Sequence, residues 1–223
     1  MIIKNYFTHT KIKSFVKAGF FTRNGGVSKK ENYSLNCSLN SKDTKLNVNK
    51  NIDICLKNLK IKKKIKFISQ IHSNKIVEIN KKNIGNKYSG DGLITSNKQI
   101  ALGVLTADCC PIFIFDIDSK FIACLHAGWR GVYKNIVKNA IKKINKIQPN
   151  KKKIRGIIGP CLDKNHFEVD KIFKIKFLKK NPLYNTFFED ILGRNKSLFN
   201  MRALIKQQLR DEKRNKKVRT YIR

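Results

Sequence analysis

Short apolar runs separated by turn residues dominate the middle of the chain. Three of these runs, ALGVLT at 101–106, PIFIF at 111–115 and FIACL at 121–125, have the length and composition of buried strands. Residues 116–119 form a turn sequence between the last two runs, so we expect those runs to form a β-hairpin. Other apolar runs predict further strands at 17–23, 66–70, 75–79, 93–95 and 155–158.

A helical period marks four longer segments. Residues 132–147 carry apolar side chains three and four positions apart with lysines between them, the pattern of an amphipathic helix packed on a core. The same period predicts helices at 47–59, 168–179 and 198–212. These elements predict an α+β fold, a mixed β-sheet core flanked by helices, in a single domain over 1–223. Residues 210–223 are mostly charged, and we expect a frayed or aberrant tail there.

The charge balance is strongly basic, with 49 Lys and Arg against 15 Asp and Glu and a formal net charge of +34. Such a balance is typical of nucleic-acid-binding proteins, but AT-rich codons also produce it by enriching a protein in Lys, Asn and Ile. The lysines are spread along the chain, and Asn and Ile are abundant too, which favours the second explanation. We therefore do not expect nucleic acid to be the main partner, although a basic surface attracts anionic small substrates.

No segment of the sequence indicates export or membrane insertion. The N-terminus lacks the apolar stretch of a signal peptide. The longest apolar run is far shorter than the roughly 20 residues that a membrane-spanning helix needs. The six cysteines lack the framework of a secreted disulfide-rich domain. We expect a cytoplasmic protein without a membrane partner, and no oligomeric state follows from the sequence.

Three potential metal ligands follow predicted strands. His72, Cys109 and His126 each lie at a strand end or in the adjoining loop, where functional sites are often assembled. One cysteine and two histidines suit a catalytic zinc, because three protein ligands leave the fourth position open, and copper also accepts these ligand types. The spacing alone is a weak signal, and by itself it favours a core cysteine and two unrelated histidines.

A second hypothesis uses two of the same residues. Cys109 as a nucleophile and His126 as its base would form a Cys–His dyad, with Asp91 or Asp108 orienting the imidazole. Such a dyad has no need of His72, which distinguishes it from the metal site.

Residues after His126 suggest an anion site. Gly131 lies at the start of the predicted helix, and helix N-termini attract anions. Arg130 and Arg23 could add positive charge for a phosphate, although a surface salt bridge explains Arg130 as well. Trp129, the one tryptophan, could stack on a base or pack in the core.

The chain also resembles the YfiH/YlmD family, the laccase-domain proteins once called multicopper polyphenol oxidoreductases and now described as purine nucleoside phosphorylases. The TADC and HAGWRG motifs in that order, with QxH upstream, are highly specific. The matching segments are FTRNGGVS at 21–28, YSLN at 33–36, QIHSNKIV at 70–77, DGLIT at 91–95, TADCCPIFIFD at 106–116, HAGWRG at 126–131 and IGPCL at 158–162.

The resemblance implies a mixed-sheet α+β fold and a zinc ion held by His72, Cys109 and His126. It also implies phosphorolysis of adenosine, inosine, guanosine and methylthioadenosine, with adenosine deamination as a further activity. Residues 37–46 depart from the family pattern. Members continue further, with a CT motif and a late arginine-rich segment, so the resemblance implies a truncated C-terminus that lacks part of the substrate pocket.

Three hypotheses follow. The leading one is a zinc-dependent purine nucleoside phosphorylase that also deaminates adenosine and takes purine nucleosides and phosphate as substrates. The second is a Cys–His hydrolase or a copper-dependent phenol oxidase. The third, from another class, is an inactive basic remnant that binds metal or nucleic acid.

Overall fold

The structure is a computed structural model of the chain, and it describes residues 6–7, 16–116, 120–147, 149 and 154–214. The chain divides into two compact units, Met1–Ile65 and Lys66–Arg223, and each is described by itself. The expectation of a single domain stays a prediction.

The first unit contains a short antiparallel strand pair and one helix. Strand β1 (Tyr6–Phe7) pairs with β2 (Phe20–Phe21), and a 3₁₀ turn, η1, spans Lys30–Asn32. Helix α1 (Lys45–Asn58) confirms the helix predicted at 47–59. It begins where the Thr44 hydroxyl accepts a hydrogen bond from the Asn47 backbone N–H, which supplies the free amide of a helix N-terminus with a partner.

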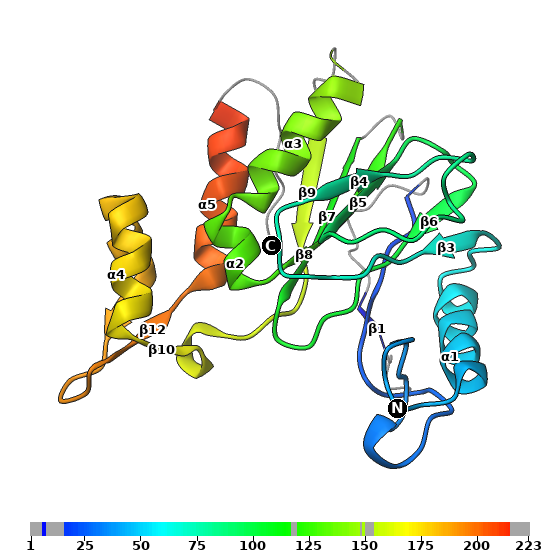
Figure 1. Cartoon of the computed structure of the whole chain (residues 1–223), viewed down its shortest axis with the longest axis horizontal. Helices are drawn as coiled ribbons and strands as arrows, with labels where there is room; N and C mark the ends of the chain where they lie inside the picture. Colours follow the sequence, from blue (N-terminus) through cyan, green and yellow to red (C-terminus); the bar gives the residue numbers. More distant parts are fainter. Residues whose placement is uncertain (1–5, 8–15, 117–119, 148, 150–153, 215–223) are drawn as a thin grey trace. The chain divides into compact units, whose positions relative to one another are not determined.

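The second unit is built on a five-stranded mixed sheet (Figure 1). Strands β4 and β5 run parallel, and the remaining neighbours are antiparallel. In spatial order the strands are β4 (Ile76–Glu78), β5 (Gly92–Thr95), β8 (Ile122–Ala127), β7 (Cys110–Asp116) and β9 (Ile154–Ile158). The predicted hairpin is confirmed as β7–β8, while its turn at 117–119 lies outside the described residues. The mixed sheet flanked by helices confirms the predicted fold class.

Apolar residues cover both faces of this sheet, because successive side chains on a strand point to opposite faces. On β5, Ile94 faces the larger core and Leu93 the smaller one. The larger core joins the sheet to α2 (Trp129–Tyr133), α3 (Ile136–Ile147) and α5 (Met201–Arg214), with α3 and α5 side by side in Figure 1. The strands β7 and β8 of the hairpin are therefore buried in this core.

A second, three-stranded sheet was not predicted. Its antiparallel strands lie in the order β10 (Glu168–Asp170), β12 (Lys196–Phe199) and β11 (Phe188–Asp190). The predicted helices at 168–179 and 198–212 each begin too early, because three or four residues are too few to display the alternation of a strand. Helix α4 (Lys171–Lys180) starts where the Asp170 carboxylate accepts the Phe173 N–H.

Three further boundaries differ from the sequence prediction. The helix predicted at 132–147 begins at Trp129 as α2 and is interrupted at residues 134–135, where Asn135 has a φ of +59°. In place of the strands predicted at 66–70 and 101–106, the structure has shorter strands that begin earlier, β3 (Lys64–Lys66) and β6 (Ile100–Leu102). Beyond them the Leu105 backbone bonds to the Gln70 side chain, which replaces strand pairing.

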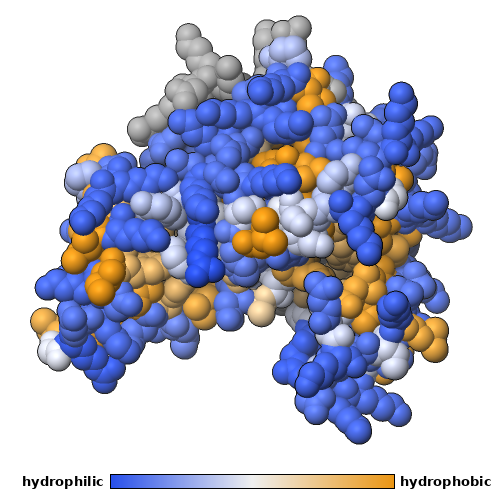
Figure 2. Space-filling model, in the orientation of Figure 1, coloured by the Kyte–Doolittle hydropathy of each residue, from blue (hydrophilic) through white to orange (hydrophobic). Residues whose placement is uncertain are grey.

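The face of the molecule that Figure 2 shows is mostly hydrophilic. Figure 2 shows blue residues over most of the visible face, with apolar groups interrupting them. Among the helices that the structure describes, none combines the length and the apolar character needed to span a membrane. Residues 210–214 are the last residues of α5, and the rest of the predicted tail lies outside the described residues.

Candidate metal centre

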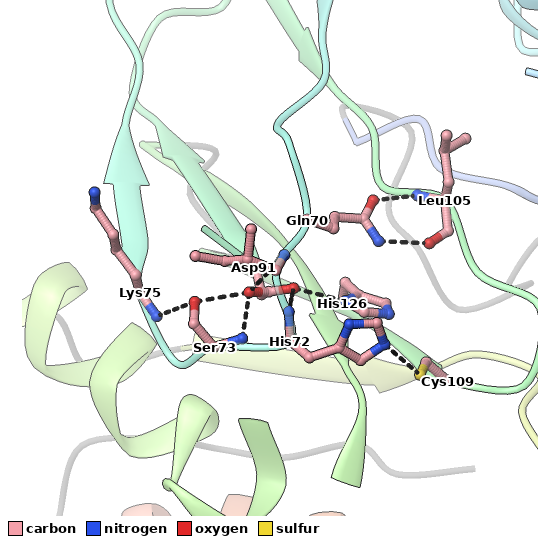
Figure 3. Close-up of polar contacts among 9 residues, drawn as sticks. Gln70, His72, Ser73, Lys75, Asp91, Leu105, Cys109 and His126 are labelled. Atoms are coloured by element: carbon pink, nitrogen blue, oxygen red, sulfur yellow. Dashed lines mark hydrogen bonds and ion pairs between the residues drawn. The ribbon is translucent and has the colours of Figure 1, made fainter. Parts of the chain in front are cut away.

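The fold brings the three predicted ligands together from distant parts of the sequence. His126 belongs to β8, and Cys109 directly precedes β7, whose Cys110 pairs with Ala127. His72 lies in the loop before β4. The potential ligand atoms of His72, Cys109 and His126 all lie within 4.8 Å of one another (Figure 3).

The spacing of these atoms fits a tetrahedral zinc ion. Sγ of Cys109 lies 3.8 Å from Nε2 of His72. Zn–S bonds of about 2.3 Å and Zn–N bonds of 2.0–2.1 Å separate sulfur and nitrogen ligands by about 3.6 Å. The rings of His72 and His126 are nearly perpendicular, with centroids 4.9 Å apart. His126 is buried, Cys109 half-buried and His72 exposed, so the group opens to solvent beside His72.

A fully buried carboxylate, Asp91, supports two of the three ligands. It accepts a hydrogen bond from Nδ1 of His126 at 2.8 Å, which directs Nε2 of that ring toward the other ligands. It also accepts the His72 backbone N–H at 3.0 Å and the Ser73 hydroxyl at 2.7 Å. One side chain therefore fixes both the orientation of His126 and the loop that carries His72 (Figure 3).

The surroundings of this pair shift both ionisation equilibria. Burial alone would raise the pKa of Asp91, but hydrogen bonds from His126 and Ser73 outweigh it and lower the pKa to about 2. Burial alone would lower the pKa of His126, but hydrogen bonds to Asp91 and Cys109 raise it to about 9. Without a metal, His126 is therefore protonated at neutral pH, and a metal ion must displace that proton to bind.

Two further features hold the loop at His72. The Gln70 amide donates to the Leu105 carbonyl at 2.7 Å and accepts the Leu105 N–H at 2.8 Å, which ties the loop to the segment leading to Cys109. His72 itself has a φ of +54°, in the left-handed region that costs non-glycine residues energy. The bond from its N–H to Asp91 helps to offset that cost.

Gly128 makes room for the ligands. A Cβ atom at this position would lie 2.8 Å from Cδ2 of His72 and 2.9 Å from Sγ of Cys109, both closer than real Cβ contacts. The backbone after His126 can therefore pass directly beside two ligands only because residue 128 has no side chain.

The residues predicted to bind an anion lie in different surroundings. Gly131 is buried inside α2, where a Cβ would lie 2.7 Å from the Ser73 carbonyl oxygen, so it permits close packing on the His72 loop. Arg130 is exposed, with its guanidinium carbon 5.1 Å from the centre of the half-buried Trp129 ring. Arg23 belongs to the first unit and donates two hydrogen bonds to the Tyr33 carbonyl.

Of the supporting residues, Asp91 was one of two carboxylates that the sequence suggested for orienting His126, and Gln70 was not suggested. Asp91, rather than Asp108, orients His126, but in the sequence Asp91 reads as part of a Gly-Asp-Gly turn. Gln70 reads as an ordinary strand residue. Gln70 was visible only as a position of the QIHSNKIV motif, because its partner is the backbone of Leu105, far away in the chain.

Comparison with known proteins agrees with these motifs. A family model described as "Multi-copper polyphenol oxidoreductase laccase" matches residues 17–219. Purine nucleoside phosphorylase RP494 of Rickettsia prowazekii is 33% identical over 147 residues, which cover 66% of this chain and 60% of that protein. Purine nucleoside phosphorylase YlmD of Bacillus subtilis is 32% identical over 166 residues, which cover 70% of this chain and 59% of that protein. The chain thus spans about 60% of the length of these relatives.

A solved structure extends the similarity to the whole fold. The crystal structure of Neisseria meningitidis protein NMB0706 aligns with a TM-score of 0.83 and 28% sequence identity. The alignment covers 98% of this chain and 86% of that one.

Proposed function

Because the chain belongs to the YfiH/YlmD family, the laccase-domain family that its motifs predict, we propose that it is a zinc-dependent purine nucleoside phosphorylase. The proposed substrates are adenosine, inosine, guanosine and methylthioadenosine, together with phosphate. The observation that carries the proposal is the convergence of the ligand atoms of His72, Cys109 and His126 within 4.8 Å. The names of the relatives support the substrate class.

The chain's own residues have distinct tasks in this proposal. His72, Cys109 and His126 hold the metal, and Asp91 keeps the His126 ring in the tautomer whose Nε2 faces the group. With zinc held by these residues, the metal would supply Lewis acidity to the substrate. The exposed side of the group, next to His72, is the approach for the nucleoside.

Phosphate needs positive charge near the nucleoside. We assign this role to Arg130. It lies two residues after Gly128, whose backbone passes beside His72 and Cys109, and is therefore close along the chain to the metal group. The anion roles that the sequence suggests for Arg23 and Gly131 stay predictions. The same site is proposed to deaminate adenosine, where water replaces the C6 amino group and ammonia leaves.

The ligand set favours zinc over a copper cluster. Thiolate and imidazole suit zinc and copper alike. A multicopper oxidase, however, needs several groups of ligands, and within the part of the chain that the structure describes only one group of three converges. The position of His72 also favours a metal site over a Cys–His dyad. Nε2 of His72 lies 3.8 Å from Sγ of Cys109, and a dyad needs no second histidine there.

A phosphate-dependent assay with inosine and adenosine tests the proposal. We expect nucleobase release to require phosphate and to fall on the order of 100-fold or more in Cys109→Ala, because a metal ligand is lost. Cys55→Ala is the matched control, since Cys55 is also half-buried but lies on α1. Equal rates in wild type and Cys109→Ala would reject the proposed site.

A further inference from the structure

The first unit contains a loop that is held closely against helix α1. The fully buried Asn51 of α1 donates hydrogen bonds to the Ser28 hydroxyl at 2.8 Å and to the carbonyls of Ser34 and Asn36 at 3.2 and 2.8 Å. The side-chain oxygen Oδ1 of Asn51 accepts the Val27 N–H at 2.8 Å. These bonds fix the loop backbone up to Asn36 on one face of α1.

Two cysteines extend this contact. Cys37 directly follows Asn36, and Cys55 lies one helical turn after Asn51, on the same face of α1. Their sulfur atoms are 3.9 Å apart, and both side chains are half-buried. A disulfide needs the sulfurs at about 2.05 Å, so the two side chains must rotate toward each other to form one.

The two thiols differ in reactivity. The hydrogen bond from Cys55 lowers the pKa of Cys37, against the opposing effect of burial. The same hydrogen bond, burial and the negative charge on Cys37 all raise the pKa of Cys55. Cys37 therefore has the character of a nucleophile, because the thiolate is the reactive form, and Cys55 retains its proton.

We propose that Cys37 and Cys55 are a peroxide-reactive thiol pair, which closes to a disulfide and ties the loop after Asn36 to helix α1. The Cys37 thiolate attacks one oxygen of hydrogen peroxide, the O–O bond breaks, and hydroxide leaves and is protonated to water, which gives a sulfenic acid. The Cys55 sulfur then attacks the Cys37 sulfur. The S–O bond breaks, and hydroxide leaves with the thiol proton as water. Two thiols lose two electrons, and one peroxide becomes two waters.

The remaining cysteines provide internal comparisons. Cys110 and Cys124 are fully buried. Hydrogen bonds from Cys110 and Arg202 lower the pKa of the half-buried Cys161 to about 6, so Cys161 is also reactive. Because Cys110 is hydrogen-bonded to Cys161, a Cys110–Cys161 disulfide is the competing product to distinguish in the same experiment.

Peptide mapping of the full chain after peroxide treatment tests the proposal. Free thiols are alkylated under denaturing conditions, and the digest is searched for a peptide that joins Cys37 to Cys55. We expect this cross-link to form before Cys161 is fully oxidised, with loss of two of the six thiols and recovery on reduction with dithiothreitol. Hydrogen exchange of α1 should slow in the oxidised protein.

Three variants sharpen the test. Cys37→Ser and Cys55→Ser should each abolish the cross-link, while Cys161→Ser should leave it intact. If Cys37 and Cys55 remain separately alkylated at peroxide doses that consume Cys161, or if Cys37 is converted to sulfinic acid without a cross-link, the proposal is wrong. Because wild-type protein supplies the decisive map, the result does not depend on how well the variants fold.

Discussion

Each unit of the molecule is organised around one fully buried polar side chain, Asp91 in the second unit and Asn51 in the first. Both accept a backbone N–H and bind a serine hydroxyl, so both hold a loop in place. Asp91 differs because it is charged and also accepts the His126 ring N–H beside an exposed His72. Asn51 is neutral, and its amide N–H groups donate to two backbone carbonyls and a serine hydroxyl. A buried polar side chain therefore supports the metal ligands in the second unit, whereas in the first unit it only holds a loop against helix α1.

The largest expected effect is on stability, and it comes from replacing the buried Asn51 by a carboxylate. Asn51→Asp removes donors to Ser28, Ser34 and Asn36 and brings a negative charge against two carbonyls. We expect the free energy of unfolding to fall by roughly 3 kcal/mol or more. Urea denaturation measures this loss, and zinc affinity of the folded fraction should not change. A stability within about 0.5 kcal/mol of wild type would contradict the account of Asn51.

The reciprocal substitution, Asp91→Asn, should act mainly on the metal. An amide keeps the shape but gives the His126 N–H a weaker acceptor and removes the charge, so we expect zinc affinity to fall about 10- to 100-fold. Competition with a chromogenic chelator measures this affinity. Asp108→Asn is the matched control, because Asp108 is exposed and no His126 bond to it is found. An unaltered affinity in Asp91→Asn would remove Asp91 from the metal centre.

The metal-free protein should reveal the Asp91–His126 pair in its pH dependence. The pKa of His126 is raised from 6.5 to about 9, so its stabilising contribution is complete below pH 6.5 and is lost as the pH rises through about 9. The pKa of Asp91 is lowered from 3.8 to about 2, so its contribution is complete above pH 3.8 and is lost as the pH falls through about 2. We expect the free energy of unfolding to fall by about 2 kcal/mol on the alkaline side. Chelator-treated Asp91→Asn should lack this decline, and an equal decline in both proteins would assign it to other groups.

The smallest predicted effect concerns phosphate. Arg130 is exposed, so Arg130→Ala should raise the apparent KM for phosphate only several-fold, with a smaller change for the nucleoside. Lys138→Ala, which removes an exposed charge from α3, serves as the control for general electrostatics. Phosphate saturation curves measure both variants, and identical values for Arg130→Ala and wild type would sink the phosphate role.

The parts of the fold that were predictable carry long, regular patterns. The apolar runs at 111–115 and 121–125 led to the hairpin β7–β8, and the helical period led to α3. The second sheet was not predicted, because strands of three or four residues show too little alternation. The break between α2 and α3 depends on the left-handed backbone of Asn135. The spacing of apolar residues does not predict such a backbone conformation.

The site was predictable in part for a similar reason. Strand ends placed His72, Cys109 and His126 in loops that could meet, but the family resemblance, not the spacing, made them a ligand set. The choice of Asp91 over Asp108 depends on a contact across the fold, and the role of Gly128 depends on the absence of a Cβ atom. Such features become visible only in three dimensions.

Metal content of the purified chain tests the central claim most directly. Elemental analysis after exhaustive dialysis should find one zinc per wild-type chain and much less than one in His72→Ala, Cys109→Ala and His126→Ala, with Cys55→Ala unchanged. No bound metal in the wild type, several coppers per chain, or zinc retained in full by all three ligand variants would contradict a single zinc held by His72, Cys109 and His126.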